Sequence, residues 1–342
     1  MLDRAPAPDF GRMTPRIAEV SPETARPLWS VMIPTYNCAP YLETTLRGVL
    51  AQAPGPERMQ IEVVDDHSTA DDPEEVVRRV GHGRVTFHRQ PENRGVVGNL
   101  NTCLRRSRGE LVHLLHGDDA VLPGFYETME AIFAADPEVA AAYCRHIYID
   151  AADRWVGIAP LVPGSSGRLA DGMRFLGSEQ RVMTPCIVVR RRAYEALHGF
   201  DDRLQCAEDW EMWMRIASRF PVYYEQRPLA CYRMHASSNT GRNIQSGRDL
   251  DHTRLAIEMF TRYTTPAAGR EIKQIAFRTY ARSALVMARR LARDGDRAGM
   301  RAQLRVAWRL RKSPRVLAEI AAIGAASLAE RGPRAPGPQR AS

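Results

Sequence analysis

Lysine is almost absent from the sequence, and this affects how its positive charge is interpreted. Only Lys273 and Lys312 are lysines, whereas all other basic residues among the 48 are arginines. An arginine preference that is spread along the whole chain reflects the base composition of a genome before it indicates nucleic-acid recognition. We therefore predict no nucleic-acid partner.

Cysteine is also scarce, and its spacing excludes two kinds of site. The six cysteines are scattered along the chain, and no two of them form a C-x-x-C pair. A disulfide framework or a zinc site needs closer, regular spacing. The pattern predicts reduced, mostly buried thiols in a cytoplasmic protein.

Long apolar runs are missing too. A bilayer span needs about 20 apolar residues, but the longest run, residues 316–329, is shorter and is interrupted by Glu319. This excludes a membrane-spanning transporter or polymerase. The first 28 residues contain five prolines and no signal-peptide pattern, which predicts a disordered leader. Residues 331–342, rich in Pro and Gly, are expected to form a disordered tail.

The net charge of +8 lies wholly in the last third of the chain. Residues 1–240 hold 27 basic and 32 acidic residues, whereas residues 241–342 hold 21 and 8, a net charge of +13. Residues 241–330 are predicted to form a basic helical extension. One of its helices, residues 299–311, places Leu304, Ala307 and Trp308 on one face. The basic flank of this helix consists of Arg301, Arg305, Arg309 and Lys312.

This amphipathic pattern leaves two interpretations open, because periodicity does not distinguish a stripe that faces lipid from one that faces protein. The helix can lie on an anionic membrane surface as a peripheral contact. Alternatively, its apolar stripe packs on the rest of the chain or on a second subunit in a homodimer.

Short strands and helices alternate over the first half of the chain. Strands are expected at residues 29–34, 61–64, 85–88 and 110–115, and helices at residues 41–51, 73–80 and 123–133. A further helix is expected after a turn at residues 93–95, through about residue 106. This alternation predicts an α/β fold, with a Rossmann-like, mostly parallel sheet flanked by helices. Further strands are expected at residues 139–149, 186–189 and 222–232, and a helix at residues 208–218.

Polar side chains follow three of the expected strands. Thr35-Tyr36-Asn37 ends the first, Asp65-Asp66 the second and Asp118-Asp119 the fourth. Functional residues of such sheets lie at the carboxyl ends of the strands. Adjacent carboxylates are suitable ligands for Mg²⁺ or Mn²⁺, although Asp and Gly are also common in simple turns.

Two further acidic groups have alternative interpretations. The Asp66 carboxylate can bind a nucleobase N–H or a ribose hydroxyl, or it can cap the helix that follows. Glu208 and Asp209 open a helix, where acidic residues are favoured by the helix dipole. A general base that deprotonates a hydroxyl is the functional alternative.

Taken in order, these segments resemble the motif set of family 2 glycosyltransferases, which are inverting enzymes with the GT-A fold. The matching segments are residues 31–37, 63–69, 92–95 with Asn99, 115–119, 199–201, 208–209 and 232–235. The resemblance covers residues 29–240, the expected catalytic domain. The chain departs from the family pattern at His116, where many relatives carry Asp, and at His67, where Gly is common.

The resemblance implies a role for each matching residue on the donor side. Pro34, Thr35 and Tyr36 would form the wall of the base pocket. Asp66 would bind the base, and Arg94 would contact base or phosphate. Further roles would fall to Asp118 at the ribose, Asp119 and His235 at a Mn²⁺ or Mg²⁺ ion, and Arg233 at the phosphates.

On the acceptor side, the resemblance implies that Asp209 is the catalytic base, with Glu208 beside it. The expected function is metal-dependent, inverting transfer of a sugar, of the hexosyltransferase type, from a nucleoside diphosphate sugar to a hydroxyl. The acceptor would be a glycan or a lipid-linked molecule in bacterial cell-surface or other glycan biosynthesis. The expected location is the cytoplasm, at the inner face of the membrane if the helical extension binds lipid.

Two other functions compete with this one. A nucleotidyltransferase shares the sheet architecture but usually opens with a Gly-rich, basic loop, which residues 35–40 lack. A basic protein that binds membrane or nucleic acid on a Rossmann-like scaffold would explain the extension. It would not explain three acidic clusters at strand or helix ends.

Overall fold

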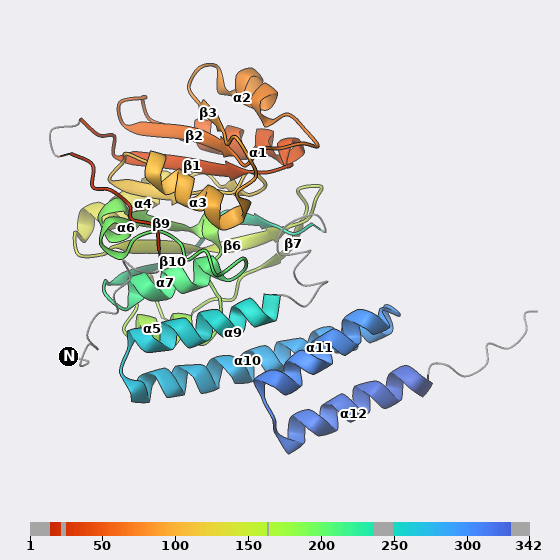
Figure 1. Ribbon diagram of the computed structural model, residues 1–342. Coiled ribbons are helices and arrows are strands. Elements are labelled where there is room, and N and C mark those ends of the chain that lie inside the picture. Colours follow the sequence, from red (N-terminus) through yellow and green to blue (C-terminus); the bar gives the residue numbers. More distant parts are fainter. Residues whose placement is uncertain (1–13, 22–24, 163, 236–248, 330–342) are drawn as a thin grey trace, which may run out of the picture.

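The chain forms a mixed sheet with helices on both faces, followed by a group of helices that lies beyond one face (Figure 1). The computed structural model describes residues 14–21, 25–162, 164–235 and 249–329. The expected disordered tail, residues 331–342, lies outside the described residues. Among the described helices, none is both long and apolar enough to span a membrane.

Ten strands form the sheet, in the order β3-β2-β1-β4-β9-β6-β10-β5, with β7 added on β6 and β8 on β10. The strands are β1 (Trp29–Thr35), β2 (Met59–Asp65), β3 (Thr86–Arg89), β4 (Leu111–Leu114), β5 (Ala120–Val121), β6 (Ala141–Ile149), β7 (Trp155–Ile158), β8 (Gly167–Arg168), β9 (Ile187–Arg190) and β10 (Val222–Arg233).

The helices fall into those that flank the sheet and those that follow it. The first group is α1 (Ala39–Leu50), α2 (Pro73–Gly81), α3 (Gly95–Arg106), α4 (Phe125–Ala135), α5 (Gly172–Gly177), the 3-10 helix η2 (Thr184–Cys186), α6 (Arg191–Leu197) and α7 (Glu208–Ala217). The second group is α9 (Asp249–Phe260), the 3-10 helix η3 (Thr261–Tyr263), α10 (Pro266–Arg293), α11 (Arg297–Leu310) and α12 (Pro314–Ala329).

The alternation of side chains along the central strands explains why helices cover both faces. In β1, Val31 and Ile33 join the core under α1, α2 and α4, whereas Met32 joins the core under α3, α6 and α7. Successive side chains of a strand point to opposite faces, so a strand that is apolar at every position must be covered twice. The predicted α/β fold with a flanked central sheet is confirmed.

The sheet changes direction halfway across. β1, β2, β3 and β4 are parallel to one another, as expected from their alternation with helices. β9 then runs antiparallel to both β4 and β6, and β10 returns parallel to β6. The sheet is therefore parallel in its N-terminal half and mixed in the remainder. The short antiparallel strands lie where the sequence loses its regular alternation.

The helices of the extension belong to two different cores. Ile257 and Phe260 of α9 and Ile272 of α10 pack with Trp210 and Trp213 of α7 in one core. The later part of α10 forms a separate core with α11 and α12. Leu304 and Ala307 of α11 are buried there, so the predicted apolar stripe faces protein, whereas Trp308 remains 37% exposed.

The segment before the sheet differs from the expected disordered leader. Residues 14–21 lie against α6, and Ile17 is buried in the core. The carbonyl oxygen of Ala18 accepts a hydrogen bond from the Arg191 guanidinium at 2.9 Å, and that of Pro15 accepts one from the Gly199 N–H. A segment with a single buried apolar side chain shows no hydrophobic period, so the sequence pattern does not predict this packing. Residues 1–13 and 22–24 lie outside the described residues.

Candidate functional site

The polar strand ends meet at one edge of the sheet. Because β1 is parallel to β2 and to β4, Thr35 lies opposite Asp65, and the turn after β4 lies on the other side of β1. The Gly117 N–H donates to the Pro34 carbonyl oxygen at 3.0 Å, which joins this turn to the end of β1. The expected gathering of these segments at the carboxyl ends is what the structure shows.

Gly117 allows the turn to approach β1 closely. A Cβ atom at this position would lie 2.8 Å from the Thr35 Oγ1 atom and 2.9 Å from the Cys38 Sγ atom. The Thr45 hydroxyl of α1 lies 3.0 Å from the Gly117 carbonyl oxygen and 2.7 Å from that of Asp119. The turn that carries the two carboxylates is therefore held from β1 and from α1.

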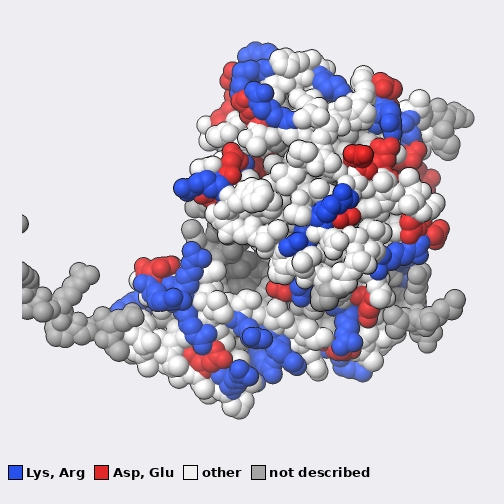
Figure 2. Space-filling model, turned by 180° about the vertical axis from the view of Figure 1, so that it is seen from behind, with Lys and Arg blue, Asp and Glu red and all other residues white. Residues whose placement is uncertain are grey.

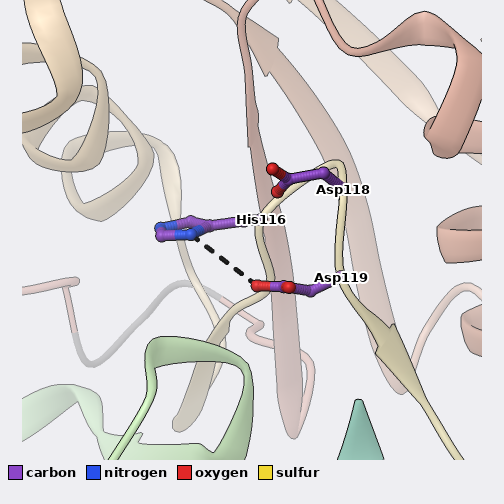
Figure 3. Close-up of side chains that lie close together, drawn as sticks. All are labelled: His116, Asp118 and Asp119. Atoms are coloured by element: carbon purple, nitrogen blue, oxygen red, sulfur yellow. Dashed lines mark ion pairs between the residues drawn. The ribbon is translucent and has the colours of Figure 1, made fainter. Parts of the chain in front are cut away.

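His116, Asp118 and Asp119 form a group that could hold a metal ion (Figure 3). One ligand atom from each lies within 4.8 Å of the others. The His116 Nδ1 atom is 3.8 Å from the Asp119 Oδ2 atom. Asp119 Oδ2 and His116 Nε2 are both buried and find no hydrogen-bond partner among the described residues. Buried polar atoms normally have partners, so this donor set fits a divalent cation.

The ionisation of these groups agrees with that fit. Burial lowers the pKa of His116, which keeps the imidazole neutral and able to bind a metal. Burial, followed by the charge of Asp118, raises the pKa of Asp119 well above its usual range. A cation beside Asp119 would reverse that shift, since an opposite charge favours the ionised carboxyl.

His235, predicted as a metal ligand with Asp119, contacts Asp118 instead. Its Nε2 atom lies 2.9 Å from the Asp118 Oδ2 atom. Burial opposes the ionisation of Asp118, but the hydrogen bond from His235 and the nearby imidazoles outweigh it and lower its pKa. His235 thus lies next to the same turn, on the side of Asp118, and its role as a ligand stays a prediction.

Arg233 lies beneath the turn rather than in an open pocket. Its backbone N–H donates to Asp119 Oδ1 at 2.8 Å, and its Nε–H donates to the Asp118 carbonyl oxygen at 2.6 Å. The two remaining nitrogens bind the Asp150 carbonyl oxygen and the Asp153 carboxylate. Because all three guanidinium nitrogens are engaged and the residue is buried, this geometry does not support the predicted contact to phosphate. Arg233 instead fixes the Asp118-Asp119 turn.

The turns after β1 and β2, where the resemblance places the nucleobase, are joined to each other. The Asn37 side-chain oxygen accepts from the Thr69 and Ala70 N–H groups, at 2.9 and 3.0 Å. Asn37 and His67 both have a positive φ, of 49° and 63°. Glycine adopts such a conformation without strain, which agrees with the family pattern expected at the position of His67.

Asp66 is placed to connect β2 with the start of α3. Its Oδ1 atom accepts a hydrogen bond from the Arg94 N–H at 2.8 Å. Burial raises the pKa of the Asp66 carboxyl to about 6. Asp65, in contrast, is committed to protein contacts with Ser68 and Arg89. The predicted contact between Asp66 and a base remains a prediction, as does the base pocket of Pro34, Thr35 and Tyr36, of which Tyr36 is 39% exposed.

The Arg94 side chain faces a second hollow. It lines a pocket of about 810 Å³ between α3, the loop before α7 and the N-terminal segment at Thr14 and Pro15. Arg105 and Arg203 line the same pocket. Arg94 therefore lies between Asp66 and this pocket.

Asp209 is a buried carboxylate at the start of α7. The Gln180 amide donates to both of its oxygens, at 2.8 and 3.0 Å, and the Thr184 hydroxyl donates at 3.3 Å. The Trp210 N–H adds a fourth contact at 2.7 Å. Burial raises the pKa of Asp209 and, together with the charge of Asp209, that of Glu208. These hydrogen bonds lower the pKa of Asp209 alone, so Asp209 ionises before Glu208.

The short helix η2 links Asp209 to the Asp-Asp turn. Thr184 contacts Asp209, and the next residue, Pro185, accepts a hydrogen bond on its carbonyl oxygen from the His113 Nε2 atom at 3.0 Å. His113 belongs to β4, the strand that leads into the turn, and burial lowers its pKa to about 4, so it is neutral. Asp209 and the Asp118-Asp119 turn are therefore connected to each other through η2 and β4.

Four contributors to the site are not predicted as functional residues by the sequence patterns: His113, His116, Gln180 and Thr184. His116 stands out in the sequence only as a departure from the family pattern, although a histidine beside two carboxylates is a usable signal. Gln180 and Thr184 lie in a segment without periodicity, and their contacts to Asp209 cross 29 and 25 residues of sequence. Nothing local indicates such a contact.

Comparisons with known proteins agree on one family. The family model for glycosyl transferase family 2 matches residues 30–197. An uncharacterized protein of Mycobacterium tuberculosis is 30% identical over 249 residues, covering 69% of this chain and 76% of the relative. The succinoglycan biosynthesis protein ExoU of Rhizobium meliloti is 27% identical over 236 residues, covering 64% of this chain and 66% of the relative.

Solved structures show the same fold. Residues 1–349 of S. aureus TarS, in complex with UDP-GlcNAc, match with a TM-score of 0.59 and 16% identity, covering 72% of this chain and 70% of that one. The mannosyltransferase PcManGT from Pyrobaculum calidifontis, in complex with GDP-Man and Mn²⁺, matches with a TM-score of 0.55 and 21% identity. That match covers 92% of this chain and 83% of the other, and so includes most of the helical extension.

Proposed function

Because the chain belongs to the family 2 glycosyltransferases with the GT-A fold, we propose that it transfers a sugar from a nucleoside diphosphate sugar to an acceptor hydroxyl with inversion. The observation that carries this proposal is that two buried acidic residues, Asp119 and Asp209, differ in their hydrogen bonding. Asp119 has a buried oxygen without a hydrogen-bond partner among the described residues, whereas the Asp209 carboxylate is held by four hydrogen bonds. The first suits a cation, and the second suits a proton acceptor.

The chemistry follows from these two groups. Asp209 takes the proton of the acceptor hydroxyl while the oxygen of that hydroxyl forms a bond to the anomeric carbon of the donor. The bond from that carbon to the diphosphate breaks, and the diphosphate leaves with the electron pair. A single displacement of this kind inverts the anomeric centre. A Mn²⁺ or Mg²⁺ ion held by Asp119, with His116 and Asp118 beside it, would neutralise charge on the diphosphate.

The donor side is supported by the residues at the ends of β1 and β2. Asp66 would bind the base, Tyr36 would stack on it, and Arg94 would contact base or phosphate. Asp118, still partly accessible beside His235, would contact the ribose. The neighbouring structures hold UDP-GlcNAc and GDP-Man respectively, so a UDP-linked or a GDP-linked sugar is the proposed donor. The proposed product is a cell-surface polysaccharide or a lipid-linked glycan.

A pair of matched variants tests this function. Asp209→Asn keeps shape and most hydrogen bonding but cannot accept a proton, so we expect turnover to fall by about 10²–10⁴. Binding of UDP or GDP, measured by calorimetry, should be unchanged. Glu208→Gln is the control and should retain most activity, because Glu208 is protonated when Asp209 ionises. Near-normal turnover by Asp209→Asn, with loss in Glu208→Gln, would transfer the role to Glu208.

A peripheral membrane contact is the second part of the proposal. Figure 2 shows basic side chains over the C-terminal helices. Arg301 and Arg305 of α11 and Lys312, which follows the helix, are exposed, as is Trp308 of α11. Arg309, by contrast, is 3.6 Å from Asp251. Each basic residue near an anionic surface contributes about 1 kcal/mol, and an exposed Trp is favoured at the interface. The enzyme would then act at the cytoplasmic face, close to a lipid-linked acceptor.

Co-sedimentation with phosphatidylglycerol-containing vesicles tests this contact. Replacing Arg301, Arg305 and Lys312 by Glu should abolish binding, and high salt should have the same effect on the unaltered protein. The control is the same charge change at Arg16, Arg78 and Arg108, which are exposed elsewhere on the molecule. Equal loss in both triple variants would show only a general charge effect. Light scattering of the same samples would report a homodimer, which stays a prediction.

A further inference from the structure

The helical extension is connected to the Asp209 carboxylate through Gln180, which forms hydrogen bonds to both. Gln180 lies in the segment between α5 and η2, and its side-chain amide donates to both Asp209 oxygens. The Gln180 backbone N–H donates to the Tyr280 hydroxyl of α10 at 3.2 Å. Asp209 and Tyr280 thus contact opposite ends of the same residue.

Packing fixes Tyr280 in this position. Its ring lies 5.4 Å from that of Trp210, which directly follows Asp209 in α7. The Trp210 indole N–H donates to the Leu176 carbonyl oxygen of α5 at 2.8 Å. A Cβ atom on Gly177 would lie 2.7 Å from the Ile272 Cγ2 atom of α10, so α5 and α10 are in close contact there. Three helices therefore enclose the segment that carries Gln180.

We propose that Gln180 positions the catalytic carboxylate and that Tyr280 holds Gln180, which makes α10 a working part of the acceptor side of the site. This inference rests on the proposed role of Asp209 as the base. An amide that donates to both oxygens sets the plane of the carboxylate. Proton transfer depends steeply on such orientation, since misplacement by about 1 Å can cost about 10²-fold in rate.

The same contact, together with those from the Trp210 N–H and Thr184, favours the ionised form of Asp209. Hydrogen bonds to the charged form stabilise it, and here they oppose the effect of burial. The other titratable groups near Asp209 are Glu208 in the same helical turn and Tyr280 from α10. Glu179 and Arg181 flank Gln180 and pair with each other at 3.1 Å. Removing the amide donor should therefore raise the pKa of Asp209.

Gln180→Met tests the inference, because methionine matches glutamine in length but offers no donor. The readout is the ¹³C shift of the Asp209 carboxyl carbon during a pH titration, assigned with Asp209→Asn. We expect the midpoint to rise by about one pH unit or more. Release of UDP or GDP from UDP-GlcNAc and GDP-mannose should show kcat reduced by about 10- to 100-fold with the donor KM unchanged. The acid limb of its pH profile should move upward with the NMR midpoint.

Tyr280→Phe keeps the ring packing and removes only the hydroxyl. We expect changes in the same direction but smaller, about threefold in kcat. Tyr224→Phe is the matched control, because the Tyr224 hydroxyl also accepts a backbone N–H, that of Val162 at 3.3 Å, away from Asp209. If the Asp209 carboxyl titrates at the same pH in Gln180→Met as in the unaltered protein, the inference is wrong. If Asp209→Asn remains active, the role of Asp209 itself is wrong, whatever the NMR result.

Discussion

Asp118 and Asp119 are neighbours in sequence but differ in their surroundings. Asp118 is paired with His235 and has a lowered pKa, whereas Asp119 is fully enclosed and has a raised one. Arg233 contributes only its backbone N–H to Asp119 and uses its guanidinium elsewhere. Asp118 is therefore hydrogen-bonded within the protein, whereas the Oδ2 atom of Asp119 has no hydrogen-bond partner in the part of the chain that the structure describes.

This difference predicts the effect of removing Asp119. In Asp119→Ala, the affinity for UDP or GDP should no longer increase on addition of Mn²⁺, and in the presence of Mn²⁺ it should be about 10- to 100-fold weaker than in the unaltered protein. Calorimetric titrations with Mn²⁺ and with chelator measure both effects. Asp294→Ala, at the exposed end of α10, is the control. Equal affinity of the unaltered protein under the two conditions would rule out Asp119 as a metal anchor.

Residues of the site can be predicted to the extent that they follow strands of the parallel half of the sheet. Thr35, Asp66 and Asp119 follow such strands, so the alternation of strands and helices in the sequence is enough to place them at one edge. The roles of Arg233 and His235 are less predictable. Whether a guanidinium reaches a ligand or the protein depends on which donors are already bound, and those partners are set by β10, beyond the regular part of the chain.

At the scale of elements, α7 is held on two sides. Its first turn carries Asp209, and its middle carries the buried Glu211. Glu211 pairs with Arg215, whose guanidinium also donates to the Leu197 and Gly199 carbonyl oxygens. The Tyr263 hydroxyl of η3 donates to Glu211 at 2.5 Å. The extension therefore stabilises the helix that carries Asp209.

Tyr263→Phe should lower the free energy of unfolding by about 1–3 kcal/mol, because it removes a hydrogen bond from a buried, charged acceptor. Chemical denaturation followed by circular dichroism measures the change. Tyr126→Phe provides a comparison, because its hydroxyl contacts the neutral His113 rather than a carboxylate. A smaller loss in Tyr263→Phe than in Tyr126→Phe would contradict the importance given to the Glu211 contact.

Elements with a clear period are predicted from the sequence within a few residues, and elements without one are not. Helix α3 is expected between a turn at residues 93–95 and about residue 106, and it occupies Gly95–Arg106, with Asp66 bound to the N–H of the preceding Arg94. Strand β5 has two residues and β8 has two, which is too short for any period to be visible. The amphipathic pattern of α11 is correct, but its partner, α10, lies nearby only because of the turn at Asp294 and Gly295.

At the scale of the whole molecule, the helices after β10 divide at the middle of α10. The first part completes the core that contains α7, whereas the second part forms a separate core with α11 and α12. Truncation after residue 245 should therefore expose Trp210 and Trp213, and the protein should aggregate or lose its cooperative unfolding transition. Truncation after residue 295 should leave a folded protein that still binds UDP or GDP. Light scattering and thermal denaturation of the two truncated forms distinguish these outcomes, and a soluble, stable 1–245 form would contradict this division.

The hydrogen bond from Arg233 to Asp119 also has a consequence for the order of events during synthesis. It joins residues that are 114 positions apart, and the contact from Tyr280 to Gln180 spans another 100. At the usual speed of a ribosome, the Asp-Asp turn leaves the exit tunnel on the order of ten seconds before the strand that secures it. During that time the nascent chain contains the Asp118-Asp119 turn without Arg233, the residue that holds it. The transferase activity can therefore appear only after residue 280 has emerged.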